Sequence, residues 1–178
     1  MTNRWVYLSP LVIALTLGII LYTAIGKDPT KLETARLNDP IPAFKLPKLS
    51  DANVFLTQEN LKGELTLLNV WATWCPSCKA EHGYLNELSK KGVKIIGLNY
   101  KDERDPALAW LEKLGNPYEF VIYDKHGKLG FDLGVYGAPE TYLVDAKGVV
   151  RYRHVGVVNH QVWQSTFMPL IQQYNLTN

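Results

Sequence analysis

The chain has 178 residues, of which 47% are apolar and 20% are charged, and its formal net charge at pH 7 is +2. This composition is ordinary for a globular protein. The sequence has no Lys/Arg cluster interleaved with aromatic residues, which argues against nucleic-acid binding. The length predicts one domain plus an additional segment.

The additional segment is at the N-terminus, where residues 5–26 contain no charged side chain. About 20 apolar residues suffice to cross a bilayer as a helix, and aromatic residues lie near both ends of this segment, as at membrane interfaces. A cleavable signal peptide is the alternative, because Ala24 and Gly26 could supply the small residues of a cleavage site. Signal peptides have shorter apolar regions, however, of about 7–15 residues. We therefore predict an uncleaved transmembrane helix preceded by a cytoplasmic tail, residues 1–4.

A polar stretch with several prolines follows this span, and we interpret residues 27–39 as a linker to a domain over residues 40–178. Within the domain, apolar runs bounded by turn residues predict strands at 44–46, 53–56, 65–71, 93–100 and 120–123. Apolar periodicity with helix-start and helix-stop residues predicts helices at 76–90, 106–114 and 161–174, the last interrupted by Pro169.

The segment 141–155 alternates apolar and polar residues around Ala146, Lys147 and Gly148, which predicts an antiparallel hairpin. Strands that alternate with helices, followed by this hairpin and a last helix, are typical of the α/β class. We therefore expect a central mixed sheet, mostly parallel with an antiparallel edge and flanked by helices, behind a single N-terminal transmembrane helix.

The only two cysteines, Cys75 and Cys78, lie at the junction of the strand at 65–71 and the helix at 76–90. A disulfide that closes so small a loop removes little entropy from the unfolded chain, so a purely structural bridge is a poor explanation. Half of a metal site, a haem-attachment motif and a redox dithiol are the other interpretations. Haem attachment is excluded because Lys79 follows Cys78 where that motif has histidine.

The predicted helix places Cys75 at its N-cap and Pro76 at its first position, where the missing N–H of proline has no consequence. Backbone N–H groups of the first turn then point at the Cys75 sulfur, and the helix dipole favours a thiolate there. Cysteines in such positions have a pKa lowered to roughly 3.5–7.5. We therefore expect Cys75 to be the nucleophile and Cys78 to resolve the mixed disulfide.

Two neighbours of the dithiol on the helix suggest further chemistry. A structural zinc site requires four ligands, and Cys75, Cys78 and His82 offer three, but His82 lies roughly 110° from the centre of the predicted inward face. Glu81 lies on that inward stripe instead. A buried carboxyl group would have a raised pKa and could transfer protons during thiol exchange. The other interpretation is a glutamate that bends out to solvent.

The motif WATWCPSC after an apolar strand, together with GAPET before the hairpin, resembles the thioredoxin superfamily. This resemblance implies a thioredoxin-like fold in which Pro139 follows a cis bond and lies against the dithiol. The stretches LLNVWATWCPSCKAEH, GLNYKDER, LGVYGAPETYLVD and RYRHVG resemble more narrowly the DsbE/CcmG thiol–disulfide interchange proteins of cytochrome c maturation. With the N-terminal span, the likeness covers nearly the whole chain.

The narrower resemblance implies a single-pass protein of the bacterial inner membrane, with its catalytic domain facing the periplasm. There it would reduce the haem-binding cysteines of apocytochrome c, or a maturation protein that holds them. A DsbD-type membrane electron donor would reduce it in turn, and no cofactor or metal is implied. Two alternatives stay open: a disulfide oxidase or isomerase with the same motif, and an anchored copper- or zinc-binding module that uses Cys75, Cys78 and a histidine.

The resemblance also implies roles for individual residues: Cys75 and Cys78 as the redox pair, Pro139 as the cis-proline, Glu81 and Glu140 as acidic residues near the site, and Trp74 and Tyr136 as walls of a groove. Asn69 stands where thioredoxin has a buried aspartate, so any buried base must be another residue, which favours Glu81. Glu140 is expected to add negative charge beside the sulfur, which would lower the reduction potential and favour basic client segments.

Overall fold

The computed structural model describes residues 9–10, 12–19 and 36–176. The chain divides into two units, Met1–Glu33 and Thr34–Asn178. In the first unit, the described residues are helical. No helix in the described part of the chain combines the length and the apolar character that crossing a membrane requires.

The predicted N-terminal organisation falls mainly on residues that lie outside the described part of the chain. These are the tail at 1–4, most of the span at 5–26 and most of the linker at 27–39. The described end of that linker, residues 36–39, belongs to the second unit and pairs with one of its strands. Asn38 donates its backbone N–H to the carbonyl of Val150 at 2.8 Å, and the N–H of Val150 donates to the carbonyl of Asp39 at 3.0 Å.

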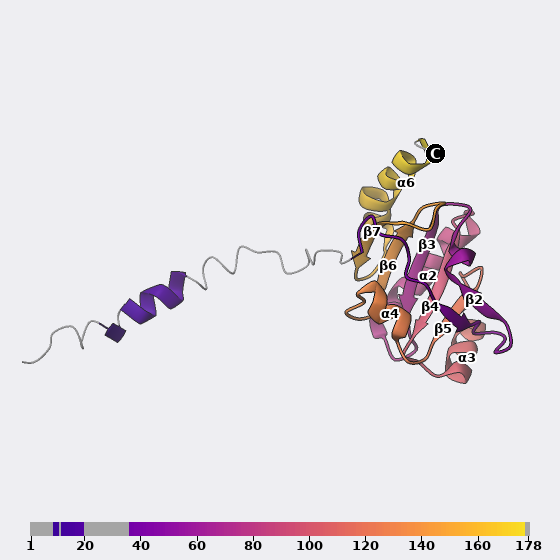
Figure 1. The fold of residues 1–178 in the computed structure, drawn as a ribbon, viewed down its shortest axis with the longest axis horizontal. Helices are drawn as coiled ribbons and strands as arrows, with labels where there is room; N and C mark the ends of the chain where they lie inside the picture. The colour runs from indigo at the N-terminus through magenta and orange to yellow at the C-terminus, as the bar shows by residue number, and fades with distance from the viewer. Residues whose placement is uncertain (1–8, 11, 20–35, 177–178) are drawn as a thin grey trace, which may run out of the picture. The chain divides into compact units, whose positions relative to one another are not determined.

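The second unit is an α/β domain built around a five-stranded mixed sheet, with strand order β5-β4-β3-β6-β7 (Figure 1). The strands are β3 (Thr66–Trp71), β4 (Ile95–Tyr100), β5 (Val121–Asp124), β6 (Glu140–Val144) and β7 (Val150–Val155). β5, β4 and β3 run parallel to one another, β6 pairs antiparallel with β3, and β7 pairs antiparallel with β6. A separate two-stranded sheet pairs β1 (Lys45–Pro47) with β2 (Phe55–Thr57). Every predicted strand is therefore confirmed within two residues.

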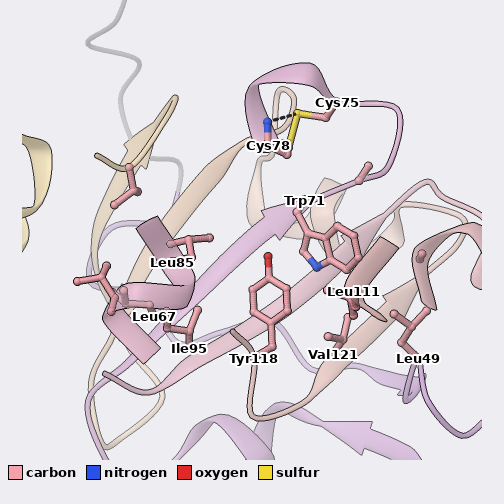
Figure 2. Packing of buried hydrophobic residues seen from close by; sticks show 14 of the residues in the cluster. Leu49, Leu67, Trp71, Cys75, Cys78, Leu85, Ile95, Leu111, Tyr118 and Val121 are labelled. Carbon is pink, nitrogen blue, oxygen red and sulfur yellow. Dashed lines mark hydrogen bonds between the residues drawn. A yellow bond between two sulfur atoms is a disulfide. The ribbon is translucent and has the colours of Figure 1, made fainter. Parts of the chain in front are cut away.

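Side chains of β3 alternate between two apolar cores, one on each face of the sheet. Leu67 and Trp71 belong to the core that Figure 2 shows, whereas Leu68 and Val70 belong to the other. Successive side chains of a strand point to opposite faces, so Asn69 lies on the same face as Leu67 and Trp71. Both cores are closed by helices, because a sheet whose strands are buried on both faces requires cover on each side.

The helices that cover the first core are α2 (Pro76–Lys90), α3 (Arg104–Leu114) and the C-terminal helix, while α4 (Lys128–Leu133) and the short 3-10 helix η1 (Gln58–Leu61) contribute to the second. The bounds of α2 agree with the prediction. No pattern in the sequence predicted α4, which has only six residues between Gly127 and Gly134, both in the left-handed conformation. So short a helix, between two glycines, shows no periodic pattern.

The C-terminal helix accommodates Pro169 through a local widening. It comprises α5 (His160–Val162), the π-helical turn η2 (Trp163–Phe167) and α6 (Met168–Leu176). Met168 donates its backbone N–H to the carbonyl of Trp163, five residues earlier. Proline in a regular helix clashes with the carbonyl four residues before it, and the wider turn lies at that point. The predicted interruption at Pro169 is thus a π-turn within one continuous helix.

Candidate active site

The dithiol lies at the junction of β3 and α2. Cys75 occupies the N-cap of α2 in an extended backbone conformation, and Pro76 is the first residue of the helix. Cys75 and Cys78 form a disulfide, and the Cys75 Sγ accepts the backbone N–H of Cys78 at 3.1 Å (Figure 2). The predicted N-cap geometry is present, and both cysteines are buried among apolar side chains of the first core.

This geometry predicts unequal reactivity of the two thiols once the disulfide is reduced. Iodoacetamide at mildly acidic pH is expected to alkylate Cys75 well before Cys78, because the helix terminus and the N–H of Cys78 stabilise a thiolate on Cys75. Mass spectrometry of the digested protein locates the label. Equal rates at the two cysteines would refute the assignment of Cys75 as the nucleophile.

Glu81 lies one helical turn beyond Cys78 and points into the protein, with 1% of its surface exposed. One carboxylate oxygen accepts the amide N–H of Asn69 at 2.8 Å, and the other accepts the backbone N–H of Val158 at 2.8 Å. Burial raises the pKa of Glu81 from 4.5 to about 7, against the two hydrogen bonds, which lower it. The solvent-facing interpretation of Glu81 is therefore wrong.

Asn69 connects Glu81 to two further buried side chains. Its amide nitrogen also donates to the hydroxyl oxygen of Thr141 at 3.0 Å, and its carbonyl oxygen accepts the hydroxyl of Tyr118 at 2.8 Å. Burial, followed by the negative charge of Glu81, raises the pKa of Tyr118 well above its ordinary value. An amide fits this position because it donates to the carboxylate while it accepts from the phenol. Glu81 is thereby the acidic group of the network.

Pro139 follows a cis peptide bond, as the resemblance implied. Its neighbour Glu140 differs from the expectation, because it is buried and bonded to Arg153 rather than presented to a client. Two guanidinium nitrogens of Arg153 donate to the carboxylate at 2.8 and 2.9 Å, and the Tyr142 hydroxyl donates to it at 2.8 Å. The backbone N–H of Tyr136 also donates to Glu140, at 2.9 Å. The charge of Glu140 is therefore compensated within the protein.

Trp74 and Tyr136 are both exposed, at 52% and 68% of their surface, so neither is a core residue. Trp74 immediately precedes the dithiol, and its indole N–H donates to the carbonyl of Lys101 at 2.9 Å. The ring of Tyr136 lies over the guanidinium of Arg153, 4.9 Å from ring centroid to the guanidinium carbon. Two aromatic side chains are thus held at the surface by polar contacts, one before Cys75 and the other before Pro139.

His82 is buried, which the helical-wheel argument did not anticipate. Its Nε2 lies 2.7 Å from the carbonyl oxygen of Gly115, and its ring lies 4.9 Å from that of Trp110. Burial lowers its pKa. Among the described residues, no three His, Cys, Asp or Glu side chains come together in a way that could hold a metal ion. His82 is therefore a packing residue of α2, and the arrangement gives no support to the metal-binding alternative.

The structure adds residues that the sequence analysis did not single out. Arg153 compensates Glu140, and Tyr118 bonds Asn69. Asp102, two residues after the end of β4, contacts the loop that precedes the dithiol. Asp102 lies within the stretch GLNYKDER, and an acidic residue at the end of a buried strand is a usable signal. For Arg153 and Tyr118 the contacts depend on strand register and loop packing, which local patterns do not reveal.

The Redoxin family model matches residues 36–166, a range that contains the dithiol and all strands of the central sheet. Two solved structures share the fold. A putative thiol:disulfide interchange protein DsbE from Chlorobium tepidum has a TM-score of 0.61 at 24% identity, over 79% of this chain and 96% of that one. A secreted thiol-disulfide isomerase from Corynebacterium glutamicum has a TM-score of 0.66 at 20% identity, over 82% and 96%. These structures show that the fold is thioredoxin-like. The Redoxin match around the Cys75–Cys78 disulfide makes the protein a thiol–disulfide oxidoreductase.

Relatives of higher sequence identity identify the family to which the protein belongs within this class. The thiol:disulfide interchange protein DsbE of Vibrio cholerae is 54% identical over 176 residues, which cover 96% of each chain. DsbE of Escherichia coli K12 is 48% identical over 179 residues, 97% of each chain, and DsbE of Pseudomonas aeruginosa is 48% identical over 171 residues, 96% of this chain and 95% of that one. The chain belongs to the DsbE family of thiol:disulfide interchange proteins.

Proposed function

We propose that this protein is a membrane-anchored periplasmic reductase of cytochrome c biogenesis. Its clients are the haem-binding cysteines of apocytochrome c or a maturation protein that holds them, and a DsbD-type membrane protein supplies its electrons. The proposal is supported by membership of the DsbE family and by the burial of Glu81 one helical turn beyond Cys78. It is also supported by the uncharged segment at residues 5–26, which would place the domain beside a membrane electron source.

The reduced dithiol would act in two exchange steps. The Cys75 thiolate attacks one sulfur of the client disulfide, which forms a mixed disulfide and releases the second client sulfur as a thiolate that takes up a proton. Cys78 then loses its proton and attacks the Cys75 sulfur, so that the client leaves with two thiols and the enzyme keeps the Cys75–Cys78 disulfide. Glu81, with its pKa near 7, is a suitable acceptor for the proton of Cys78.

The observation that carries the reducing direction is the burial of Glu81 one turn beyond Cys78. A carboxyl group there disfavours negative charge on nearby sulfur, so the reduced form gains less from thiolate stabilisation than in a strongly oxidising relative. Glu140 does not contribute to this lowering of the potential, because Arg153 compensates its charge. The expected preference for basic clients rested on the charge of Glu140 and is therefore no longer supported by it. Glu81 alone therefore supports the low potential.

The reducing direction predicts a low midpoint in an equilibrium titration against glutathione and dithiothreitol. We expect a potential below about −180 mV, on the reducing side of protein disulfide isomerase. The thiols can be quantified by alkylation and mass at each ratio. A midpoint around −120 mV, as in strongly oxidising proteins, would assign the protein to disulfide formation and overturn the proposed reductase.

The client class requires its own measurement. In full-length protein with Cys78→Ala, the mixed disulfide on Cys75 cannot be resolved, so clients remain covalently bound and can be identified by mass spectrometry after reduction. The matched control is Cys75→Ala, which lacks the attacking sulfur and retains Cys78. Recovery of apocytochrome c or of a maturation protein with the first variant and not the second is the expected result. Trapped proteins unrelated to cytochrome c would refute the assigned pathway.

A further inference from the structure

The loop between β4 and α3 holds a buried carboxylate, Asp102, that the exchange steps do not use. One of its oxygens accepts the backbone N–H of Thr73 at 2.6 Å and the side-chain amide of Asn99 at 2.9 Å. The other accepts the hydroxyl of Thr73 at 2.6 Å and the backbone N–H of Glu103 at 2.9 Å. Two of these four neutral donors come from Thr73, two residues before Cys75.

Lys101, the residue before Asp102, contacts Trp74, which follows Thr73 in the loop that leads into Cys75. The carbonyl of Lys101 accepts the indole N–H of Trp74, whose side chain is exposed. Lys101 adopts a left-handed conformation, with φ of 49°, that is unfavourable for a residue with a side chain. This conformation directs the Lys101 carbonyl to Trp74 and the Asp102 carboxylate to Thr73.

The turn is itself held on its other side. Lys101 donates its backbone N–H to the carbonyl of Asp124 at the end of β5, at 3.0 Å. The hydroxyl of Tyr123 donates to the carbonyl of Asp102 at 3.2 Å. The turn is therefore bonded to the sheet and, through Thr73 and Trp74, to the segment that leads into Cys75. It can transmit the rigidity of the sheet to that segment.

We propose that Lys101 and Asp102 form a clamp that presets Trp74 as a binding surface for the client segment beside its disulfide. In this role Asp102 is a positioning residue, and Trp74 contacts an apolar or aromatic residue that neighbours the client cysteine. Preset aromatic side chains bind with less loss of conformational freedom than mobile ones. The inference deepens the proposed function, since it rests on exchange through Cys75, but it does not depend on which protein the client is.

The test compares two disulfides that differ in whether they reach Trp74. One is a short peptide closed by a Cys-X-X-Cys disulfide with an aromatic residue next to it, and the other is 2-hydroxyethyl disulfide. In the full-length protein, Asp102→Asn places an amide donor against the donors of Thr73 or Asn99. We expect kcat/KM for the peptide to fall about tenfold, mainly through KM, and the rate with the small disulfide to change less than about twofold.

Two further comparisons separate this role from a general effect on folding. Thr73→Val removes the hydroxyl bond to Asp102 and should reproduce the peptide-specific loss, whereas Thr73→Ser should restore the wild-type KM. Asp145→Asn is the matched control. Asp145 follows the end of β6 that lies away from Pro139, and it is also buried. Its carboxylate accepts two backbone N–H groups and one guanidinium N–H of Arg151. Asp145→Asn should leave the ratio of the two rates unchanged.

The remaining outcomes distinguish a failure of the proposed clamp from a failure of the proposed function. An equal loss with both disulfides, or an unchanged KM for the peptide in both Asp102→Asn and Thr73→Val, would overturn the clamp while the proposed function stands. Wild-type protein that reduces neither disulfide would overturn the proposed function, and the clamp with it.

Discussion

Replacing Glu81 with glutamine is expected to remove a pH dependence of stability that spans about three kilocalories per mole. The folded protein raises the pKa of Glu81 from 4.5 to about 7, mainly because burial disfavours its charged form. Between these values the folded state keeps a proton that the unfolded chain has lost. The stability that Glu81 contributes is therefore complete below about pH 4.5 and is lost as the pH rises to about 7, with a total of about 3 kcal/mol.

The measurement is urea unfolding of oxidised wild-type and Glu81→Gln protein at several pH values. The difference in unfolding free energy between the two should move by about 3 kcal/mol in favour of the variant between about pH 4 and about pH 8. Burial lowers the pKa of His82 and of His154, so their contribution to stability increases with pH. That contribution is common to both proteins and cancels in the difference. A difference that stays constant with pH would refute the raised pKa.

The same variant tests the proton-accepting role of Glu81. If Glu81 takes the proton of Cys78, the pH profile of thiol exchange in the reduced protein should shift in Glu81→Gln, since the variant amide cannot accept that proton. A residue that only supports packing would change the rate by a constant factor at every pH. The shape of the profile, rather than its height, therefore decides between the two roles.

Local patterns were sufficient to predict the elements that carry the dithiol. A continuous apolar run predicted β3, and a proline at the first helical position predicted the start of α2. The inward stripe of α2 offered a buried Glu81 as one of two interpretations, and the structure has Glu81 buried. Each of these features depends on residues close in sequence. They gave the N-cap position of Cys75 correctly because capping is a local property of the chain.

The errors concern contacts between elements distant in sequence. The wheel argument gave α2 one inward direction, but α2 also packs against Trp110 and the carbonyl of Gly115, which buries His82 as well. Glu140 was expected to face a client because its neighbour is the cis-proline. Its actual partner is set by the register of β6 and β7, which contains an irregularity at Leu143 and Val144. Such a register cannot be inferred from alternation alone.

Loss of the Arg153 guanidinium is expected to cause the largest loss of stability of any single change discussed above. Arg153 lies opposite Tyr142 in the register of β6 and β7, and its side chain reaches diagonally to Glu140. The side chains of Arg153 and Glu140 are 1% and 0% exposed. In Arg153→Met a buried carboxylate keeps only the Tyr142 hydroxyl and backbone donors. Removing one partner of a buried pair costs about 3–5 kcal/mol, which urea unfolding can measure.

Three variants test whether this cost belongs to the ion pair and not to the shape of the arginine. Arg153→Met combined with Glu140→Gln removes both charges, so the double variant should be more stable than Arg153→Met alone. Arg153→Lys retains the charge but cannot donate two parallel bonds, so its stability should fall between those of wild type and Arg153→Met. Lys128→Met breaks the exposed pair with Asp132 and should change stability little. Glu140 accepts the backbone N–H of Tyr136, and the Arg153 guanidinium lies beneath the Tyr136 ring. A double variant no more stable than Arg153→Met would mean that the guanidinium acts by packing beneath Tyr136, and the ion-pair explanation would be wrong.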